Sequence, residues 1–378
     1  MRYRYSVNEK GKLVKKAVVY TSKEHGIAHS DVDPQAIYIV ERLWANGFET
    51  YIVGGAVRDL LLHKKPKDFD IVSTANPARI KRIFRNARII GHRFRLVHVY
   101  FGSKIYEVST FRSIKDGPTG NIFGTIEEDV LRRDFTLNAL FYDPIKQIVV
   151  DYVGGMKDIR KKIIRPIIAL SSIFTDDPVR MIRAVKYGAV TGFKLPITLR
   201  LKIRSQSNLL ASVSPSRLTE EITKIINSQR TCEIVKSLDD YGLYSYLQPE
   251  AAGLFRTMQG FKERYLKTMG APSAEGVRGE RMSVLIRDYL DDNADWDGKS
   301  NGNYPAAAAA ELKSAAERHK NAFILARKFV LPMNPPRMEL DAAIRLLFAE
   351  HGVIIKKSTA FMPRRRERKR TSSENAKP

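Results

Sequence analysis

The stretch Tyr51–Val72, YIVGGAVRDLLLHKKPKDFDIV, constrains the fold more than any other part of the sequence. An apolar run ends at a glycine pair, Gly54 and Gly55, and a helix-forming segment follows. Asp68 and Asp70 then lead into a second apolar run, and residues two apart in a strand face the same side. The pattern predicts a strand, a tight turn, a helix and a second strand in close succession, which is typical of a mixed α/β layer.

Each half of this stretch has an ordinary interpretation beside a chemical one. A glycine pair makes a tight turn, but it also lets backbone N–H groups at a helix start approach a phosphate. Two carboxylates such as Asp68 and Asp70 are usually solvated, but side by side they repel unless a cation lies between them. Glu107, an acidic residue inside the apolar strand YEVSTFR, is the candidate third carboxylate. Together these features predict a site for a nucleoside triphosphate and bridging Mg²⁺.

The charge balance points to a polyanionic partner. The chain has 65 Lys and Arg against 41 Asp and Glu, a formal net charge of +24. Residues 356–378 contribute +7, and the remaining 355 residues still carry +17. A bias of this size favours binding to nucleic acid or to an anionic membrane surface. Because the charge is spread through the folded part of the chain, we expect a nucleic-acid surface.

The sequence predicts a cytoplasmic protein with no membrane association. Cys232 is the single cysteine, which excludes an intrachain disulfide and a cysteine-based zinc site. The N-terminal residues MRYRYSVNEKGKLVKK lack the apolar core of a signal peptide. No apolar run approaches the roughly 18 residues that would span a bilayer. We expect a monomer by default.

The hydrophobic pattern predicts an α+β chain, with a mixed-sheet head followed by an all-α neck and body. Within the head we expect a helix over residues 129–143 and a strand hairpin over 147–167. The expected segments are an extended N-terminal arm at 1–34, a head at 35–168, a helical neck at 169–235, a helical body at 236–355, for which the family resemblance of the motifs below implies RNA binding, and a basic disordered tail at 356–378.

Several motifs in order resemble a known family. VGGAVRDLLL and KDFDIV are followed by EVSTFR, RRDFTLNAL and DDPVRMIRA. This series resembles the class II nucleotidyltransferases of the polymerase-beta superfamily, which comprise bacterial poly(A) polymerases and the tRNA CCA-adding enzymes. The resemblance runs over residues 35–250 and implies a polymerase-beta-like nucleotidyltransferase head.

The resemblance implies a role for each matching residue. Asp68 and Asp70 match the metal-binding catalytic carboxylates, and Glu107 matches the third catalytic acid. Arg217 and Glu221 match an arginine–glutamate motif of the neck, where Ser216 replaces the common acidic residue. Asp176 stands where the family usually has Glu. The residues implied in nucleotide binding are Gly54, Gly55, Arg58, Arg112, Arg132, Arg133, Asp134, Asp177, Arg180 and Arg183.

Asp177 and Arg180 suit base selection on physical grounds as well. Three residues apart on a helix, they share a face. A carboxylate accepts a hydrogen bond from an exocyclic amine, and a guanidinium donates one to a ring nitrogen. Adenine and cytosine both present that edge, whereas guanine and uracil present the reverse. The pair therefore predicts selection of ATP and CTP, without deciding between them.

Two basic segments favour a poly(A) polymerase. IIGHRFRLVHVYFG resembles the corresponding signature of bacterial poly(A) polymerases, and its Arg93 and Arg95 alternate with apolar residues, so that both face one side near an RNA 3′ end. Arg364, Arg365 and Arg366 lie in a basic tail that resembles the extension of the same enzymes and would attract RNA phosphates.

We therefore expect template-independent addition of AMP from ATP to RNA 3′ ends, with release of pyrophosphate and two Mg²⁺ ions, Mn²⁺ being an alternative. CCA addition to tRNA is the nearest alternative, and a non-catalytic RNA-binding protein is the alternative of another class. RNA 3′ ends, ATP and RNA-decay or RNA-chaperone proteins are the expected partners.

Overall fold

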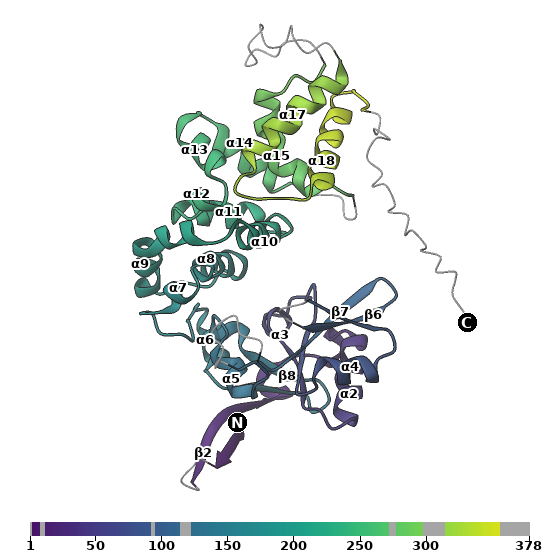
Figure 1. Cartoon of the computed structure of the whole chain (residues 1–378). Coiled ribbons are helices and arrows are strands. Elements are labelled where there is room, and N and C mark those ends of the chain that lie inside the picture. The colour runs from purple at the N-terminus through teal and green to yellow at the C-terminus, as the bar shows by residue number, and fades with distance from the viewer. Residues whose placement is uncertain are drawn as a thin grey trace, which may run out of the picture. The chain divides into compact units, whose positions relative to one another are not determined.

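The computed structural model describes residues 2–7, 12–91, 95–113, 122–271, 277–297 and 314–355. The contacts divide the chain into two compact units. The first comprises residues 1–272 with 331–334, and the second comprises 273–330 with 335–378. Figure 1 shows the order of the elements along the chain. Among the described helices, none is both long and apolar enough to cross a membrane.

The described residues of the first unit form a nine-stranded sheet in the order β1-β2-β9-β8-β3-β4-β7-β6-β5. Among these described strands only β4 and β7 pair in parallel, and the other neighbours pair antiparallel. This mixed sheet confirms the predicted α+β head. The strands are β1 Arg2–Val7, β2 Leu13–Thr21, β3 Thr50–Val53, β4 Asp70–Ser73, β5 Ala87–Ile90, β6 Leu96–Phe101, β7 Lys104–Thr110, β8 Leu140–Asp143 and β9 Ile148–Asp151.

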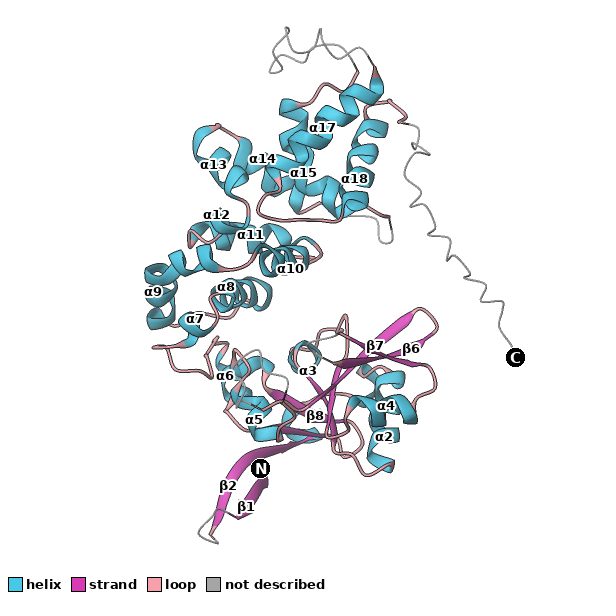
Figure 2. Ribbon diagram, viewed as in Figure 1, coloured by secondary structure: helices cyan, strands magenta, loops and turns pink. Residues whose placement is uncertain are grey.

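The central strands are continuous apolar runs because both of their faces are covered. Every residue of β3 and of β8 is buried. The helices associated with the sheet (Figure 2) begin at local signals: the Asp33 and Asn76 side chains cap α2 and α4, with a proline at each first helical turn. The short helices of this part are α1 Ser22–His25, η1 His29–Asp31, α2 Pro34–Ala45, α3 Gly55–Leu61, α4 Pro77–Ile83, α5 Ile126–Leu131, η2 Thr136–Asn138 and α6 Gly155–Lys161.

Two predicted elements of the head are wrong. The helix expected over 129–143 ends at Leu131, and after a turn and η2 the chain enters the buried strand β8. The strand hairpin expected over 147–167 is β9 followed by helix α6. At β8 an apolar stretch satisfies helix and buried-strand patterns equally well, so that its neighbours in the sheet decide. In α6, GMKDIRK, the apolar residues Met156 and Ile159 are three apart, which is a helical spacing.

The N-terminal residues, expected as an extended arm, form a hairpin that belongs to the sheet. β1 pairs with β2, and β2 pairs with β9, so that β1 is an edge strand. Residues 22–33 then run through α1 and η1 to the start of α2.

In the first unit helices follow the sheet, and in the second unit the described elements are helices, which confirms the predicted all-α remainder for the described residues. In the first unit they are α7 Ile173–Asp176, α8 Val179–Thr191, α9 Ile197–Gln206, η3 Ser207–Ser212, α10 Pro215–Ile226, α11 Thr231–Asp240, α12 Tyr244–Leu247, α13 Pro249–Thr257 and α14 Phe261–Met269. In the second unit α15 Glu280–Asn293, α17 Ala315–Phe329 and α18 Arg337–Glu350 pack on one another, and Tyr289 stacks on Phe329 at 4.3 Å between ring centroids.

Candidate active site

Two of the three predicted carboxylates lie directly opposite each other on neighbouring strands. Asp70, the first residue of β4, pairs in parallel register with Glu107 of β7 and in antiparallel register with Val53 of β3. Both residues keep part of their surface exposed to solvent, although surrounding protein atoms bury much of each carboxyl group. Asp68 comes two residues before β4 begins, so it lies in the preceding loop rather than in the strand. The candidate third carboxylate, Glu107, thus lies on the strand next to Asp70, and its catalytic role stays a prediction.

The charges of these acids are not balanced within the protein. Burial of the group in surrounding protein, followed by the negative charge of Glu107, raises the pKa of Asp70 to about 6, and Asp68 adds to the rise. Burial also raises the pKa of Glu107, against the opposing charges of Arg112 and Lys224. Like charges held together in this way favour a bound cation.

The acids fit Mg²⁺ by the chemistry of their oxygen donors. Among the described residues, no group of three or more His, Cys, Asp or Glu side chains is arranged to hold a metal by itself. Mg²⁺ does not require such a cage, because proteins usually bind it through one or two carboxylates together with the phosphates of a substrate. Asp70 with Asp68 or Glu107 would supply the protein part of such a site.

The glycine turn lies beside Asp70. Gly54 follows β3 with φ +72°, a conformation that favours glycine, and α3 begins at Gly55. A Cβ atom placed on Gly54 would lie 3.6 Å from the Asp70 Oδ2 atom. The first amides of a helix have no acceptor within it, so that this turn presents N–H groups next to the acids.

One arginine of the turn after α5, Arg132, has an unused hydrogen-bond donor. Among the described residues the buried Nη1 atom of Arg132 has no partner. Burial lowers the pKa of Arg132 to about 10, and the neighbouring charge of Arg112 contributes, followed more weakly by those of Arg133 and Arg180. Several arginines whose charges act on one another, one of them with an unused Nη1 donor, are the arrangement that an anionic ligand such as a triphosphate would stabilise.

Two other predicted nucleotide-binding arginines use their guanidinium groups within the protein. Arg58 donates from Nε to Asp59 at 2.9 Å and from Nη1 to Asn138 at 3.0 Å. Arg133 donates to the Asp129 carboxylate at 2.8 Å and to the Asn138 carbonyl at 3.0 Å. Both arginines therefore fix the loop that follows α5, a role that their spacing in the sequence did not indicate.

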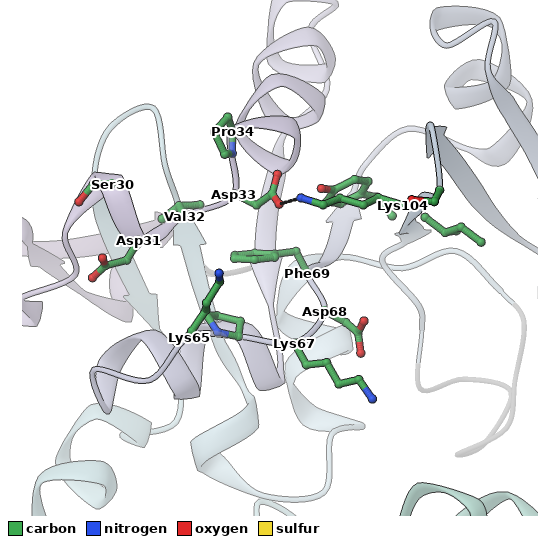
Figure 3. Close-up of a pocket in the computed structure, with 14 residues that line it drawn as sticks. Ser30, Asp31, Val32, Asp33, Pro34, Lys65, Lys67, Asp68, Phe69 and Lys104 are labelled. Atoms are coloured by element: carbon green, nitrogen blue, oxygen red, sulfur yellow. Dashed lines mark hydrogen bonds and ion pairs between the residues drawn. The ribbon is translucent and has the colours of Figure 1, made fainter. Parts of the chain in front are cut away.

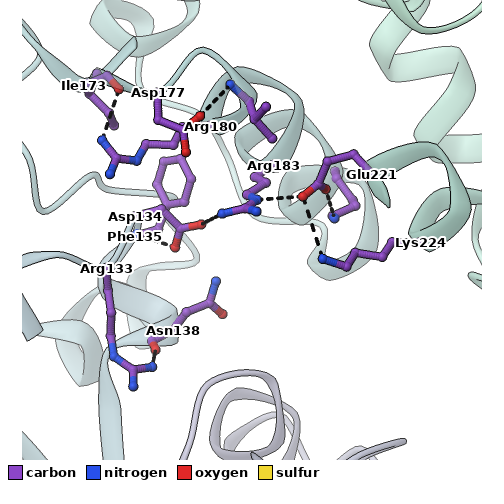
Figure 4. Close-up of polar contacts among 12 residues, drawn as sticks. Arg133, Asp134, Phe135, Asn138, Ile173, Asp177, Arg180, Arg183, Glu221 and Lys224 are labelled. Carbon is purple, nitrogen blue, oxygen red and sulfur yellow. Dashed lines mark hydrogen bonds and ion pairs between the residues drawn. The ribbon is translucent and has the colours of Figure 1, made fainter. Parts of the chain in front are cut away.

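Asp177 and Arg180 come together at the start of α8 (Figure 4). Asp177 is buried, accepts a hydrogen bond from the Val179 amide at 3.2 Å, and receives Arg217 Nη2 at 2.9 Å on each carboxylate oxygen. Arg180 donates to the Ile173 carbonyl at 3.2 Å, and burial lowers its pKa. Arg217 thus pairs with Asp177, and this ion pair holds the Asp177 side chain in one orientation.

A charged network joins the turn after α5 to two helices. Arg183 Nη1 lies 4.0 Å from Asp134, and Arg183 Nε lies 2.9 Å from Glu221 of α10. Lys186 Nζ contacts the same Glu221 carboxylate at 2.8 Å. These cations hold the pKa of buried Glu221 at about 2, against the effect of burial. Lys186 was missed from the sequence, although its spacing of three from Arg183 places both on one helical face.

A cavity of the head has Asp68 in its wall. Its volume is about 720 Å³, and Lys67, Phe69 and Tyr106 also line it (Figure 3). On its wall Lys104 Nζ binds Asp33 at 2.8 Å. The cavity could not be predicted from the sequence, because its wall combines segments that are about 70 residues apart.

The predicted RNA-binding residues are mostly outside the described part of the chain. Arg93 and the tail residues Arg364, Arg365 and Arg366 lie outside the described residues. Arg95 is exposed immediately before β6, the strand that pairs with β7. Their role in binding RNA stays a prediction.

Two family models match the chain. Residues 50–165 match the poly A polymerase head domain, which contains the glycine turn, the three acids and Arg132. Residues 192–254 match a model described as the probable RNA and SrmB-binding site of polymerase A. The strands from β3 to β9 and the three acids thus lie in the segment that matches the head domain, whereas β1 and β2 precede it.

Curated relatives include two kinds of enzyme. Poly(A) polymerase I of Escherichia coli O157:H7 is 40% identical over 253 residues, which are 63% of this chain and 54% of that protein. The CCA-adding enzyme of Geobacillus kaustophilus is 35% identical over 67% of this chain and 62% of its own length. The match therefore spans little more than half the length of the Escherichia coli relative.

Solved structures support the same fold. The crystal structure of the Bacillus stearothermophilus CCA-adding enzyme in complex with CTP is 27% identical, with a TM-score of 0.54, covering 84% of this chain and 83% of that one. A CCA-adding enzyme in complex with ATP, at 18% identity and a TM-score of 0.53, shares the fold.

Proposed function

The chain belongs to the class II nucleotidyltransferases that include bacterial poly(A) polymerases and CCA-adding enzymes, and from this premise we propose that it is a template-independent poly(A) polymerase. It would transfer AMP from ATP to RNA 3′ ends and release pyrophosphate. The observation that carries the transfer chemistry is the placement of Asp70 opposite Glu107 and beside the glycine turn.

The acids and the turn serve different parts of one nucleotide. The amides after Gly54, with the unpartnered Arg132 donor, would bind the triphosphate. Glu107 would accept the proton of the RNA 3′ hydroxyl as this oxygen attacks the α-phosphate, and its raised pKa suits a proton acceptor. Bound Mg²⁺, held by Asp70 with Asp68, would supply charge neutralisation at the reacting phosphate.

The start of α8 would select the base. Arg217 orients the buried Asp177 carboxylate, whose remaining lone pairs can accept from an exocyclic amine. Arg180 would donate to the ring nitrogen beside that amine. This pattern accepts adenine and cytosine alike, so the choice of ATP rests on the identity of 40% with poly(A) polymerase I against 35% with the CCA-adding enzyme.

CCA addition is the second candidate, favoured by the structural similarity to the Bacillus stearothermophilus enzyme. Purified protein incubated with ATP and CTP, an unstructured RNA and a tRNA that ends before CCA separates the two. We expect AMP tracts on the unstructured RNA. If C and then A join only the tRNA, the poly(A) proposal is wrong; if neither RNA is extended, both are.

The setting of the reaction is also part of the proposal. The net charge of +24 supports RNA as the polyanionic partner. We propose a cytoplasmic monomer that uses Mg²⁺ and works with RNA-decay or RNA-chaperone proteins. Crosslinking from cytoplasmic extract, followed by identification of bound RNA and protein, tests these partners.

A further inference from the structure

The β1–β2 hairpin presents a surface that the proposed reaction does not use. It lies outside both segments that match family models. β2 joins the sheet through β9, and β1 remains the edge strand (Figure 2). An exposed edge strand is a liability that folded proteins usually blunt with charged or inward-pointing residues.

This edge instead carries exposed aromatic rings. Tyr3 and Tyr5 are 42% and 54% exposed, and their ring centroids lie 6.3 Å apart in an edge-to-face arrangement. Lys15 of β2 places its Nζ atom 3.7 Å from the centroid of the Tyr3 ring. Leu13, on the same strand as Lys15, is 72% exposed. Rings and a cation held together at the surface form a platform on which a nucleobase can stack.

The charge of the hairpin fits a polyanion. Residues 1–21 contain six Lys and Arg and one Glu, a net charge of +5. Arg4 is partly neutralised, because its Nη2 atom contacts Glu49 at 2.7 Å. Lys15 and Lys16 are both exposed. Exposed aromatic rings among cations are the combination by which proteins bind single-stranded nucleic acid without sequence preference.

The topology sets the distance between this platform and the acids. Five strand spacings separate β1 from β4, which carries Asp70. At about 4.8 Å per spacing, the two strands are roughly 24 Å apart across the sheet, and any offset along the strands adds to this distance. Stacked nucleotides advance about 3.4 Å each, so that roughly seven of them span this distance.

We propose that the β1–β2 hairpin binds single-stranded RNA upstream of the 3′ end, with bases stacked on Tyr3 and Tyr5 and phosphates near Lys15. The choice of RNA rests on the proposed function, since the same head domain would extend the 3′ end. The hairpin then holds an RNA that is long enough to reach from the acids to the sheet edge, and it does not touch a shorter one.

The test is a pair of binding measurements with fluorescently labelled oligoadenylate, about 5 and about 20 nucleotides long, without ATP. The double variant Tyr3→Thr/Tyr5→Thr keeps residues of high strand propensity but removes the rings. We expect about a tenfold loss of affinity for the long RNA and none for the short one. Tyr3→Phe/Tyr5→Phe, which keeps the rings, should bind both as the unchanged protein does.

Single lysine variants provide an independent measurement. Lys15→Gln should reduce the salt dependence of binding to the long RNA by about 0.7 in the slope of log K against log salt. Lys81→Gln is the matched control, because exposed Lys81 lies on α4, which packs beside β5 and β6 at the opposite edge of the sheet. Its effect should be the same for both RNA lengths.

If the Thr variant binds the long RNA with unchanged affinity, the proposal is wrong, and pairing of the β1 edge with a strand of another protein becomes the alternative. Equal losses on both RNA lengths also overturn the proposal. If the Thr variant melts at a lower temperature than the unchanged protein, the Lys15→Gln measurement alone tests the proposal. The proposal is then wrong if Lys15→Gln and Lys81→Gln show the same salt slope for binding to the long RNA. RNA binding does not depend on catalysis. If the protein binds long RNA through the hairpin but transfers no AMP, the proposed function is wrong and the hairpin proposal stands.

Discussion

Replacing Glu221 with Gln tests whether the network between α8 and α10 stabilises the fold. The Glu221 side chain is 1% exposed and contacts Arg183 and Lys186 at 2.9 and 2.8 Å. Its pKa is about 2, against an ordinary value of 4.5. Each unit of pKa corresponds to about 1.4 kcal/mol, so the interaction contributes about 3 kcal/mol at neutral pH. Removing one partner of a buried ion pair costs a similar amount, roughly 3–5 kcal/mol.

The pH dependence of the loss follows from the direction of the shift. Because folding lowers the pKa of Glu221, its contribution is complete above about pH 4.5 and is lost as the pH falls toward 2. The difference in unfolding free energy between the unchanged protein and Glu221→Gln should therefore narrow over this range. Burial already lowers the pKa of Lys186, and the loss of the Glu221 charge lowers it further, which reduces the cost of leaving this lysine without its partner.

Urea unfolding followed by circular dichroism measures the difference, and hydrogen exchange of the α8 and α10 amides locates it. Glu220→Gln is the matched control, because the Glu220 side chain is 61% exposed and its ion-pair partner, Lys224, is 50% exposed. Its expected effect is below about 0.5 kcal/mol. Equal losses in the two variants, or a Glu221→Gln loss that does not narrow in acid, would refute the reasoning.

Further variants test the acids and the arginines. Asp70→Asn should abolish AMP transfer while RNA affinity in a gel-shift assay stays the same. In metal-free buffer this variant should also melt at a higher temperature than the unchanged protein at pH 7, but not at pH 4. The reason is that folding raises the Asp70 pKa, so that the ionised form of Asp70 opposes folding. Arg132→Gln should raise the KM for ATP about 10- to 100-fold, since it removes a charged donor, and a KM within twofold would contradict the assignment. Arg217→Ala should lower the kcat/KM ratio of ATP over GTP, measured with each nucleotide alone, because Asp177 loses the group that orients it.

The sequence predicted the local geometry of the acids well. Alternation placed Asp68 and Asp70 in one strand and Glu107 in another, and the register confirms Asp70 and Glu107 on neighbouring strands, whereas Asp68 lies in the loop before β4. Both inferences need only the periodicity of one strand or the composition of one turn. Their roles in binding metal and moving a proton stay predictions. The same local rules misplaced the chain after Leu131, where the apolar residues of β8 also satisfy a helical pattern.

Contacts between distant segments could not be predicted in this way. Arg217 pairs with Asp177 across 40 residues, and Arg58 with Asn138 across 80. Family resemblance indicated roles for Arg58, Asp177 and Arg217, but not for Asn138. It also did not show that, among the described residues, Arg58 uses its donors on protein groups while Arg132 leaves one unused. That difference depends on which carboxylates the fold brings near each guanidinium, and it makes Arg132 a better candidate than Arg58 for the triphosphate contact.

Two turns with the same local sequence differ in the anion that their amides can bind. Val-Gly-Gly occurs at residues 53–55 and again at 153–155, each time between a strand and a helix. In the second turn the Asp151 carboxylate accepts hydrogen bonds from the amides of residues 153–156 at 2.8–3.0 Å. The equivalent position before the first turn is Tyr51, whose hydroxyl donates to Glu49 instead. The second turn therefore carries its own anion, whereas no hydrogen bond from the first turn's amides to a side chain is found among the described residues, which leaves those amides for the triphosphate that we propose. A glycine pair alone predicts the turn, and the residue two positions before the valine decides whether a phosphate can occupy it.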